Sequence, residues 1–266
     1  MIVIRVEIIQ LEMSVGKMKI GFRSFITKRD MEIAMRLGIE VIEVNWEIVT
    51  KSRADEVKGL LREYGLKPSA MTVSSTSTPT DLEGFRKDFE FAESIGCAVY
   101  VAHLGPLTYK DRDAIAAFKT FWTPICKVAK DKGVKIAVQS CGLDPESWDV
   151  MLEAVPEFGL KYDPSFSAQA GRNYRMEVIK YGSFITHIHS KDEIALNRTS
   201  NYESGITHFR YVPSGMGDIH WASIIALLYE AGYKGDIAIE PHSGYWMENL
   251  EQCLSLSKRH LEQFIV

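Results

Sequence analysis

Short apolar runs alternate with longer amphipathic segments along most of the chain. Runs rich in Val, Ile and Ala are typical of buried strands, and the segments between them have the 3.6-residue spacing of helices. Gly38, Gly65 and Gly96 follow three of these helical segments, where a residue in the left-handed conformation often ends a helix. The predicted strands are 19–23, 41–45, 69–73, 98–102, 134–138, 160–162, 184–188 and 237–239. The predicted helices are 29–37, 53–64, 81–95, 111–132, 176–180, 221–231 and 247–264, with Pro124 expected to kink the fourth or to start a second helix there.

Repeated strand–helix units predict a parallel sheet, and eight strands followed by a closing helix predict a (β/α)₈ barrel. The 266 residues agree with the ~250 typical of such a barrel. Neither GxGxxG after the first strand nor GxxxxGK[ST] is present, which argues against an open nucleotide-binding sheet. We expect one domain over residues 18–266, preceded by an extension or edge strand at 1–17. Arg5, Glu7 and Glu12 make that segment a poor signal peptide.

Composition narrows the class of protein further. A net charge of −4 gives no reason to expect a nucleic acid or an anionic membrane as partner. The four cysteines form no CxxC pair, so a reducing, cytoplasmic location is expected instead of a disulfide framework. No apolar run approaches the ~20 residues of a membrane span.

Polar side chains end each of the last four predicted strands. Because strand side chains alternate between faces, Gln139, Asp163, His189 and Glu240 all point into the barrel at its carboxyl end. Barrel enzymes place their active sites at that end. Buried polar groups need partners, and a shared divalent cation would serve all four. Two carboxylates, one imidazole and one amide oxygen suit Mn, Co, Mg or Zn.

At this point the chain resembles the xylose isomerase-like TIM barrels, a family that includes sugar phosphate isomerases and epimerases, inosose dehydratases and, more distantly, endonuclease IV. The resemblance runs from about Met18 to the C-terminus. The stretches that carry it are 160–164 (LKYDP), 187–192 (HIHSKD), 215–219 (GMGDI), 232–235 (GYKG) and 239–241 (IEP).

The resemblance implies a metal held by Glu, Asp, His and Glu from the last four strands. Asp163, His189 and Glu240 match this pattern, whereas Gln139 stands where the family has a glutamate. A glutamine can ligate a metal but cannot act as a base, so a symmetric two-base epimerisation loses one base. Glu240 remains as the catalytic base. Lys191 is the candidate for a second proton carrier or an oxyanion stabiliser.

Further departures make the expected pocket more apolar than that of a typical sugar epimerase. Phe166 and Cys141 stand where the family often has histidines. His187 lies one layer deeper than His189, which favours a structural role. The candidates for substrate contact are His103, His187, Arg210, Trp46 and Trp246.

These features favour a metal-dependent isomerase or epimerase acting on a small sugar or sugar phosphate. An inosose-type dehydratase and a non-catalytic carbohydrate-binding barrel with a degenerate metal site remain alternatives. Phe209-Arg210-Tyr211 replaces the Asp-Arg-His segment of endonuclease IV, so a three-zinc nuclease is not expected. A homo-oligomer is possible, because barrels of this type often pair through their loops.

Overall fold

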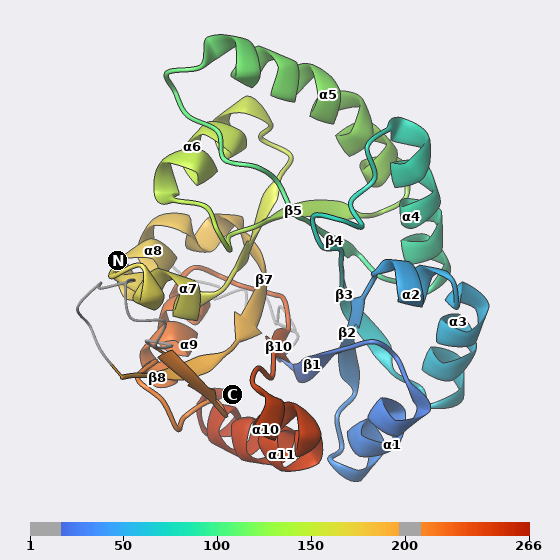
Figure 1. Ribbon diagram of the computed structural model, residues 1–266, viewed down its shortest axis with the longest axis vertical. Helices are drawn as coiled ribbons and strands as arrows, with labels where there is room; N and C mark the ends of the chain where they lie inside the picture. The colour runs from blue at the N-terminus through green and yellow to red at the C-terminus, as the bar shows by residue number, and fades with distance from the viewer. Residues whose placement is uncertain (1–16, 197–208) are drawn as a thin grey trace, which may run out of the picture.

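Eight parallel strands close into a barrel with helices around its outer face (Figure 1). The computed structural model describes residues 17–196 and 209–266. Around the barrel the order is β1-β10-β7-β6-β5-β4-β3-β2, so the last strand pairs with the first. The predicted eight-stranded (β/α)₈ barrel is confirmed. The strands are β1 (Ile20–Ser24), β2 (Val41–Asn45), β3 (Lys67–Thr72), β4 (Val99–Ala102), β5 (Lys135–Gln139), β6 (Gly159–Tyr162), β7 (Ile185–Ser190) and β10 (Ile237–Ile239).

Helices begin where short polar side chains can cap them. The carboxylates of Asp81, Asp111 and Asp144 each accept a hydrogen bond from the backbone N–H three residues on, which satisfies one of the free donors of a helix start. None of the helices within the described ranges has the length and apolar character to cross a membrane. The helices are α1 (Lys28–Arg36), α2 (Ile48–Lys51), α3 (Ala54–Glu63), α4 (Leu82–Ser94), α5 (Arg112–Asp131), α6 (Pro145–Ala154), α7 (Pro164–Gln169), α8 (Tyr174–Tyr181), α9 (Trp221–Glu230), α10 (Gly244–Glu248) and α11 (Leu250–Leu261).

Helix α5 continues through Pro124 as one element, so of the two alternatives expected at Pro124, a kink or a second helix, no second helix begins there. The buried residues Trp122, Ile125, Cys126 and Ala129 lie on both sides of the proline, and their packing supports the helix there. Pro124 itself is exposed, so water can reach the carbonyl left without an N–H donor. Packing of the apolar face therefore stabilises the helix by more than Pro124 destabilises it.

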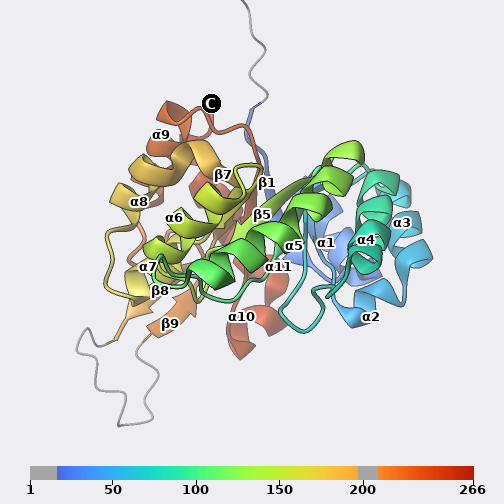
Figure 2. The same ribbon diagram turned by 90° about the horizontal axis from the view of Figure 1, so that it is seen from above.

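A two-stranded antiparallel hairpin, β8 (Asp192–Ala195) and β9 (Phe209–Val212), follows β7 directly. It lies on the same side of the barrel as α10 (Figure 2). The sequence analysis did not predict this hairpin. The extension or edge strand expected at 1–17 falls, except for residue 17, outside the described residues.

The inside of the barrel is lined by small apolar and by charged side chains. Ala70, Val101 and Ala137 form a small apolar cluster of their own, separate from the main core between strands and helices. Their small size leaves room on the axis of the barrel for longer polar side chains, among them the fully buried Glu43 and Lys161. The barrel therefore carries charge in its interior, below the level of its mouth.

Candidate active site

Four neighbouring strands bring the predicted ligand set together at one end of the barrel. Gln139 ends β5, Asp163 follows β6 and caps α7, His189 lies in β7, and Glu240 follows β10. All four side chains are buried. One ligand atom from each of Asp163, His189 and Glu240 lies within 4.8 Å of the others. The inward orientation inferred from strand alternation thus brings three of the four within reach of a single ion.

Glu240 is surrounded by cationic and hydrogen-bonding groups. Its Oε1 accepts a hydrogen bond of 2.5 Å from Arg23 Nη1. Its Oε2 lies 3.1 Å from His189 Nδ1, 3.0 Å from His242 Nε2 and 3.5 Å from Lys191 Nζ. Burial alone would raise the pKa of this carboxyl, but His189, His242 and Lys191 together hold it well below the ordinary value. Glu240 is therefore ionised at neutral pH.

Two lysines lie beside Asp163. Lys191 Nζ is 2.8 Å from Asp163 Oδ2 and Lys161 Nζ is 3.8 Å from the same oxygen. Burial would raise the pKa of Asp163, but the two ammonium groups outweigh it and lower that pKa. Burial also lowers the pKa of Lys161, whereas the carboxylates of Asp163 and Glu240 outweigh burial at Lys191 and raise its pKa. Lys161 shares the inward face with Asp163, and this alternation was the signal in the sequence that could have identified it.

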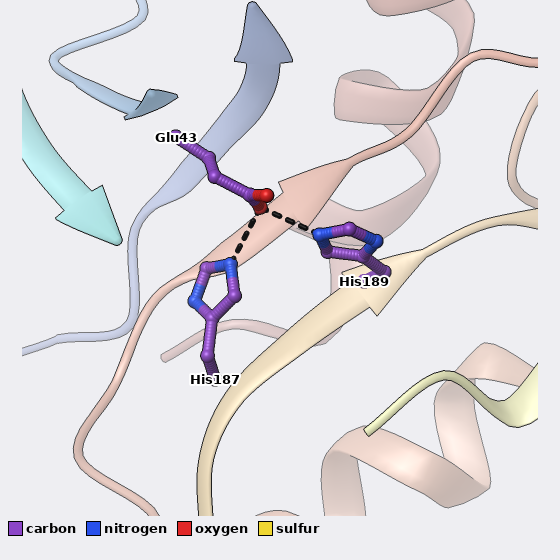
Figure 3. A group of neighbouring side chains, drawn as sticks. All are labelled: Glu43, His187 and His189. Carbon is purple, nitrogen blue, oxygen red and sulfur yellow. Dashed lines mark hydrogen bonds and ion pairs between the residues drawn. The ribbon is translucent and has the colours of Figure 1, made fainter. Parts of the chain in front are cut away.

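A carboxylate from the opposite side of the barrel joins the two histidines of β7 (Figure 3). Glu43 Oε2 lies 2.7 Å from His187 Nε2 and 2.6 Å from His189 Nε2. All three side chains are fully buried. Burial opposes ionisation of Glu43, but His189 and His187 hold its pKa well below the ordinary value. The sequence analysis missed Glu43, although a carboxylate between Ile42 and Val44 in a predicted core strand is itself a signal.

The cluster fits a divalent metal ion. Because His189 Nε2 donates to the Glu43 carboxylate, the other ring nitrogen, Nδ1, points toward Glu240 Oε2 at 3.1 Å and would be the metal ligand atom of the neutral imidazole. A carboxylate behind a histidine is the usual support of a metal ligand. Gln139 Oε1 is a buried acceptor without a hydrogen-bond partner among the described residues. A cation held between it, Asp163 and His189 would give this oxygen a partner.

A cavity of about 490 Å³ adjoins the cluster on the side of β1, β2 and β10. Glu240 is 8% exposed and belongs to both the buried cluster and the cavity wall, so it connects the two. Arg23 Nη2 donates a 2.7 Å hydrogen bond to Asn45 Oδ1, which fixes the guanidinium at this wall. The lining residues are Arg23, Ser24, Phe25, Asp30, Asn45, Glu47, Ser74, Glu240, Pro241, His242, Ser243, Met247 and Leu250.

His103 lies half-buried just after β4, on the same side of the barrel as the cluster. Burial, together with the positive charges of Lys161 and Arg23, lowers its pKa to about 4. His103 is therefore neutral at physiological pH and can both donate and accept a hydrogen bond. His187 Nε2 is bonded to Glu43 Oε2 inside the barrel.

The remaining candidates for substrate contact lie apart from the cluster. Trp46 is buried, stacks on Phe91 at 4.0 Å between ring centroids and donates from Nε1 to Asp88, so it packs against α4 instead of walling the pocket. Trp246 is half-buried on α10. Arg210 is exposed on β9, opposite Ile194 of β8.

The β8–β9 hairpin brings a further titratable side chain, Glu193, close to the site. Glu193 in β8 is 2% exposed, and Gln169 Nε2 donates to its Oε2 and also lies 3.2 Å from the hydroxyl of Tyr211. Burial raises the pKa of Glu193 to about 7. The folded protein therefore binds a proton at Glu193 more tightly than the unfolded chain does.

This raised pKa predicts a pH-dependent loss of stability that Glu193→Gln removes. Between the ordinary pKa of 4.5 and the folded value of about 7 the folded state holds the extra proton, so stability falls as pH rises through this window. The free energy of unfolding of Glu193→Gln minus that of the wild type should increase by roughly 2 kcal/mol from pH 5 to pH 8. Urea unfolding at both pH values measures it, with exposed Glu40→Gln as the control expected to show no such increase. An unchanged difference would contradict the prediction.

The chain matches the family described as xylose isomerase-like TIM barrel over residues 31–262. No curated protein matches it. Similar solved structures include a xylose isomerase domain protein from Planctomyces limnophilus, with 18% identity, 93% of this chain and 97% of that chain covered, and a TM-score of 0.74. An IolI protein with a bound zinc atom has 18% identity, coverages of 93% and 99%, and a TM-score of 0.69. The D-allulose 3-epimerase from Methylomonas sp. in complex with D-allulose has 17% identity, coverages of 93% and 97%, and a TM-score of 0.67.

At these identities the structural likeness shows the fold. The family match covers most of the chain and confirms the resemblance seen in the sequence. It also supports the expectation of an enzyme. The chain belongs to the xylose isomerase-like TIM barrel family.

Proposed function

We propose that this protein is an isomerase or epimerase-type enzyme that acts on a small sugar, sugar phosphate or related polyhydroxy carbonyl compound. The observation that carries the proposal is the position of Glu240, an ionised carboxylate that links a buried charged cluster to an open cavity. An ionised carboxylate at a cavity wall can accept a proton from a bound substrate. Membership of the family supports this reaction class.

In the proposed mechanism Glu240 removes a proton from the carbon next to the substrate carbonyl. Arg23 and His242 hold the carboxylate in place, and Lys191 lies 3.5 Å from Oε2, where it can stabilise negative charge or return a proton. Gln139 cannot act as a second base on the opposite face. The site therefore favours a transfer by one base, such as an aldose–ketose shift, over a symmetric two-base epimerisation.

Gln139, Asp163, His189 and Glu240 would hold a divalent ion such as Mn, Co, Mg or Zn. When bound, the ion supplies a Lewis acid that stabilises charge on the substrate oxygens. The zinc atom in the IolI protein supports this part of the proposal. Glu43 keeps His189 in the tautomer with a free Nδ1 lone pair, so it is a positioning residue.

A small polyhydroxy compound is the substrate class that the cavity suits. Its volume of about 490 Å³ is within the range of ligand sites, and its wall carries the hydroxyl, amide and guanidinium groups that bind sugar hydroxyls. The Methylomonas epimerase that was solved with D-allulose supports this choice. His103, neutral and half-buried near the cluster, is a further proposed contact.

Hydrogen exchange with solvent tests the proposal. The protein is incubated in D₂O with a panel of ketoses, ketose phosphates and inososes, with Mn²⁺ or with EDTA, and NMR follows the C–H next to each carbonyl. We expect protein-dependent loss of that proton signal for at least one compound, together with an isomeric product. A product that has lost water would assign a dehydratase instead. Saturable binding with neither exchange nor product would leave a non-catalytic carbohydrate-binding barrel.

A further inference from the structure

The ammonium group of Lys191 lies between the two carboxylates of the ligand set. Its Nζ is 2.8 Å from Asp163 Oδ2 and 3.5 Å from Glu240 Oε2. Oxygen atoms from these two residues, with Nδ1 of His189, form the group that could hold a metal ion. A side chain of this protein thus already contributes a positive charge between the oxygens that a metal would join.

The charges around this position are balanced without a metal ion. Three carboxylates, those of Asp163, Glu240 and Glu43, face three cationic groups. Lys191 and Lys161 lie 2.8 Å and 3.8 Å from Asp163, and Arg23 contacts Glu240 and lies 3.8 Å from Glu43. Gln139, the fourth member of the set, brings no charge. A divalent ion added to this arrangement would leave an excess of positive charge in a buried space, which is costly unless one cation moves away.

The packing around Lys191 holds its ammonium in this position. The side chain is 1% exposed, and Nζ lies 3.4 Å from the ring centroid of Phe166 and 5.6 Å from that of Tyr211. Aromatic faces attract an ammonium but cannot coordinate a metal through hard ligand atoms. The aromatic surroundings of Nζ therefore suit the ammonium group of a lysine better than they suit a divalent metal ion.

We infer that Lys191 is the resident cation of the Asp163–Glu240 pair, and that a divalent ion binds there only by displacing the Lys191 ammonium. The inference rests on the proposed function in taking Asp163, His189 and Glu240 as metal ligands. It adds that this chain's own lysine competes with the metal and weakens its binding. The affinity of the wild type for metal is thereby set by Lys191 as well as by the ligands.

Metal affinity of the full chain, measured without substrate, tests the inference. Wild type, Lys191→Met and Lys161→Met are stripped with EDTA and titrated with Mn²⁺ and Zn²⁺ by calorimetry. Methionine keeps most of the side-chain volume and removes the charge. We expect Lys191→Met to bind each ion about tenfold or more tightly than the wild type, because the competing cation is gone. Lys161→Met is the matched control: it removes an equally buried charge that lies 3.8 Å from Asp163 Oδ2 instead of 2.8 Å and is not between the two carboxylates, so its gain should be clearly smaller.

Equal gains in the two variants would overturn displacement in favour of a general charge effect, and no gain in Lys191→Met would overturn the inference outright. Anomalous diffraction from wild-type crystals soaked in Mn²⁺ gives an independent test that does not depend on how the variants fold. A manganese peak beside Asp163 with Lys191 turned away supports displacement, whereas a peak with Lys191 still in contact with Asp163 contradicts it. Tighter binding by Lys191→Met without hydrogen exchange on any carbonyl compound would sustain this inference and reject the proposed function.

Discussion

Replacing Glu240 with Gln is expected to reduce the rate of substrate hydrogen exchange by about three orders of magnitude, because the amide cannot accept the proton. The substitution keeps the size and shape of the side chain. A fall in kcat larger than any change in KM is the expected pattern when the assay contains saturating Mn²⁺, which compensates for the loss of Glu240 as a proposed metal ligand. Steady-state kinetics on the substrate identified by the exchange panel measures both quantities.

The matched control for this prediction is Glu40→Gln, the same chemical change at an exposed glutamate that pairs with Lys19. It should retain the wild-type rate within experimental error. Far-ultraviolet circular dichroism and a thermal melt establish that Glu240→Gln is folded. A folded Glu240→Gln protein with an undiminished rate would move the base to another residue of the site.

Glu43→Gln is expected to lower the free energy of unfolding by about 4 kcal/mol, although Glu43 has no access to solvent or substrate. The carboxylate accepts from His187 and His189 in a space from which water is excluded. Both imidazoles bond to the same oxygen, Oε2, so an amide oxygen there would accept from them without the negative charge, and the NH₂ group would take the place of Oε1 and face the Arg23 Nε donor. Urea unfolding followed by circular dichroism measures the loss.

The same variant should bind metal 10- to 100-fold more weakly, because His189 is no longer held with Nδ1 free. Glu40→Gln serves again as the control, and its stability and metal affinity are expected to stay close to those of the wild type. A Glu43→Gln protein as stable as the wild type would mean that the carboxylate is neutral or that the bridge to the histidines contributes little.

Periodicity was sufficient to predict the barrel, since each buried strand is a short apolar run and all but the fifth predicted strand are followed by a predicted helix. Helix α6, after β5, was not predicted. The β8–β9 hairpin escaped prediction for a physical reason. Its strands, Asp192–Ala195 and Phe209–Val212, are short, partly exposed and separated by a long connection, so they have neither the apolar run of a core strand nor a tight turn between them. Helix α5 is the opposite case, in which packing overrode the local signal of Pro124.

Strand alternation predicted which side chains of the candidate site point into the barrel, but not which of them contact each other across it. Asp163, His189 and Glu240 do meet, because inward-facing residues at the ends of neighbouring parallel strands must lie close together. The same alternation places Lys161 and Glu43 inside the barrel, but a position inside does not reveal a partner across it. Which carboxylate faces which cation depends on the distances between non-adjacent strands, and a one-dimensional pattern does not contain them.

The bridge from Glu43 to His187 and His189 spans 144 and 146 residues of sequence and joins β2 to β7. An isolated half-barrel of β1–β4 would keep Arg23 at 3.8 Å from Glu43 but would lack both histidine donors. An isolated half-barrel of β5–β10 would keep Glu240 beside His189 but would leave His187 Nε2 without its carboxylate. Each half is therefore penalised until the other is in place. The barrel is therefore expected to close late and in one cooperative step. The hydrogen bonds from Glu43 to the two histidines join two halves of the chain that the ribosome synthesises at different times.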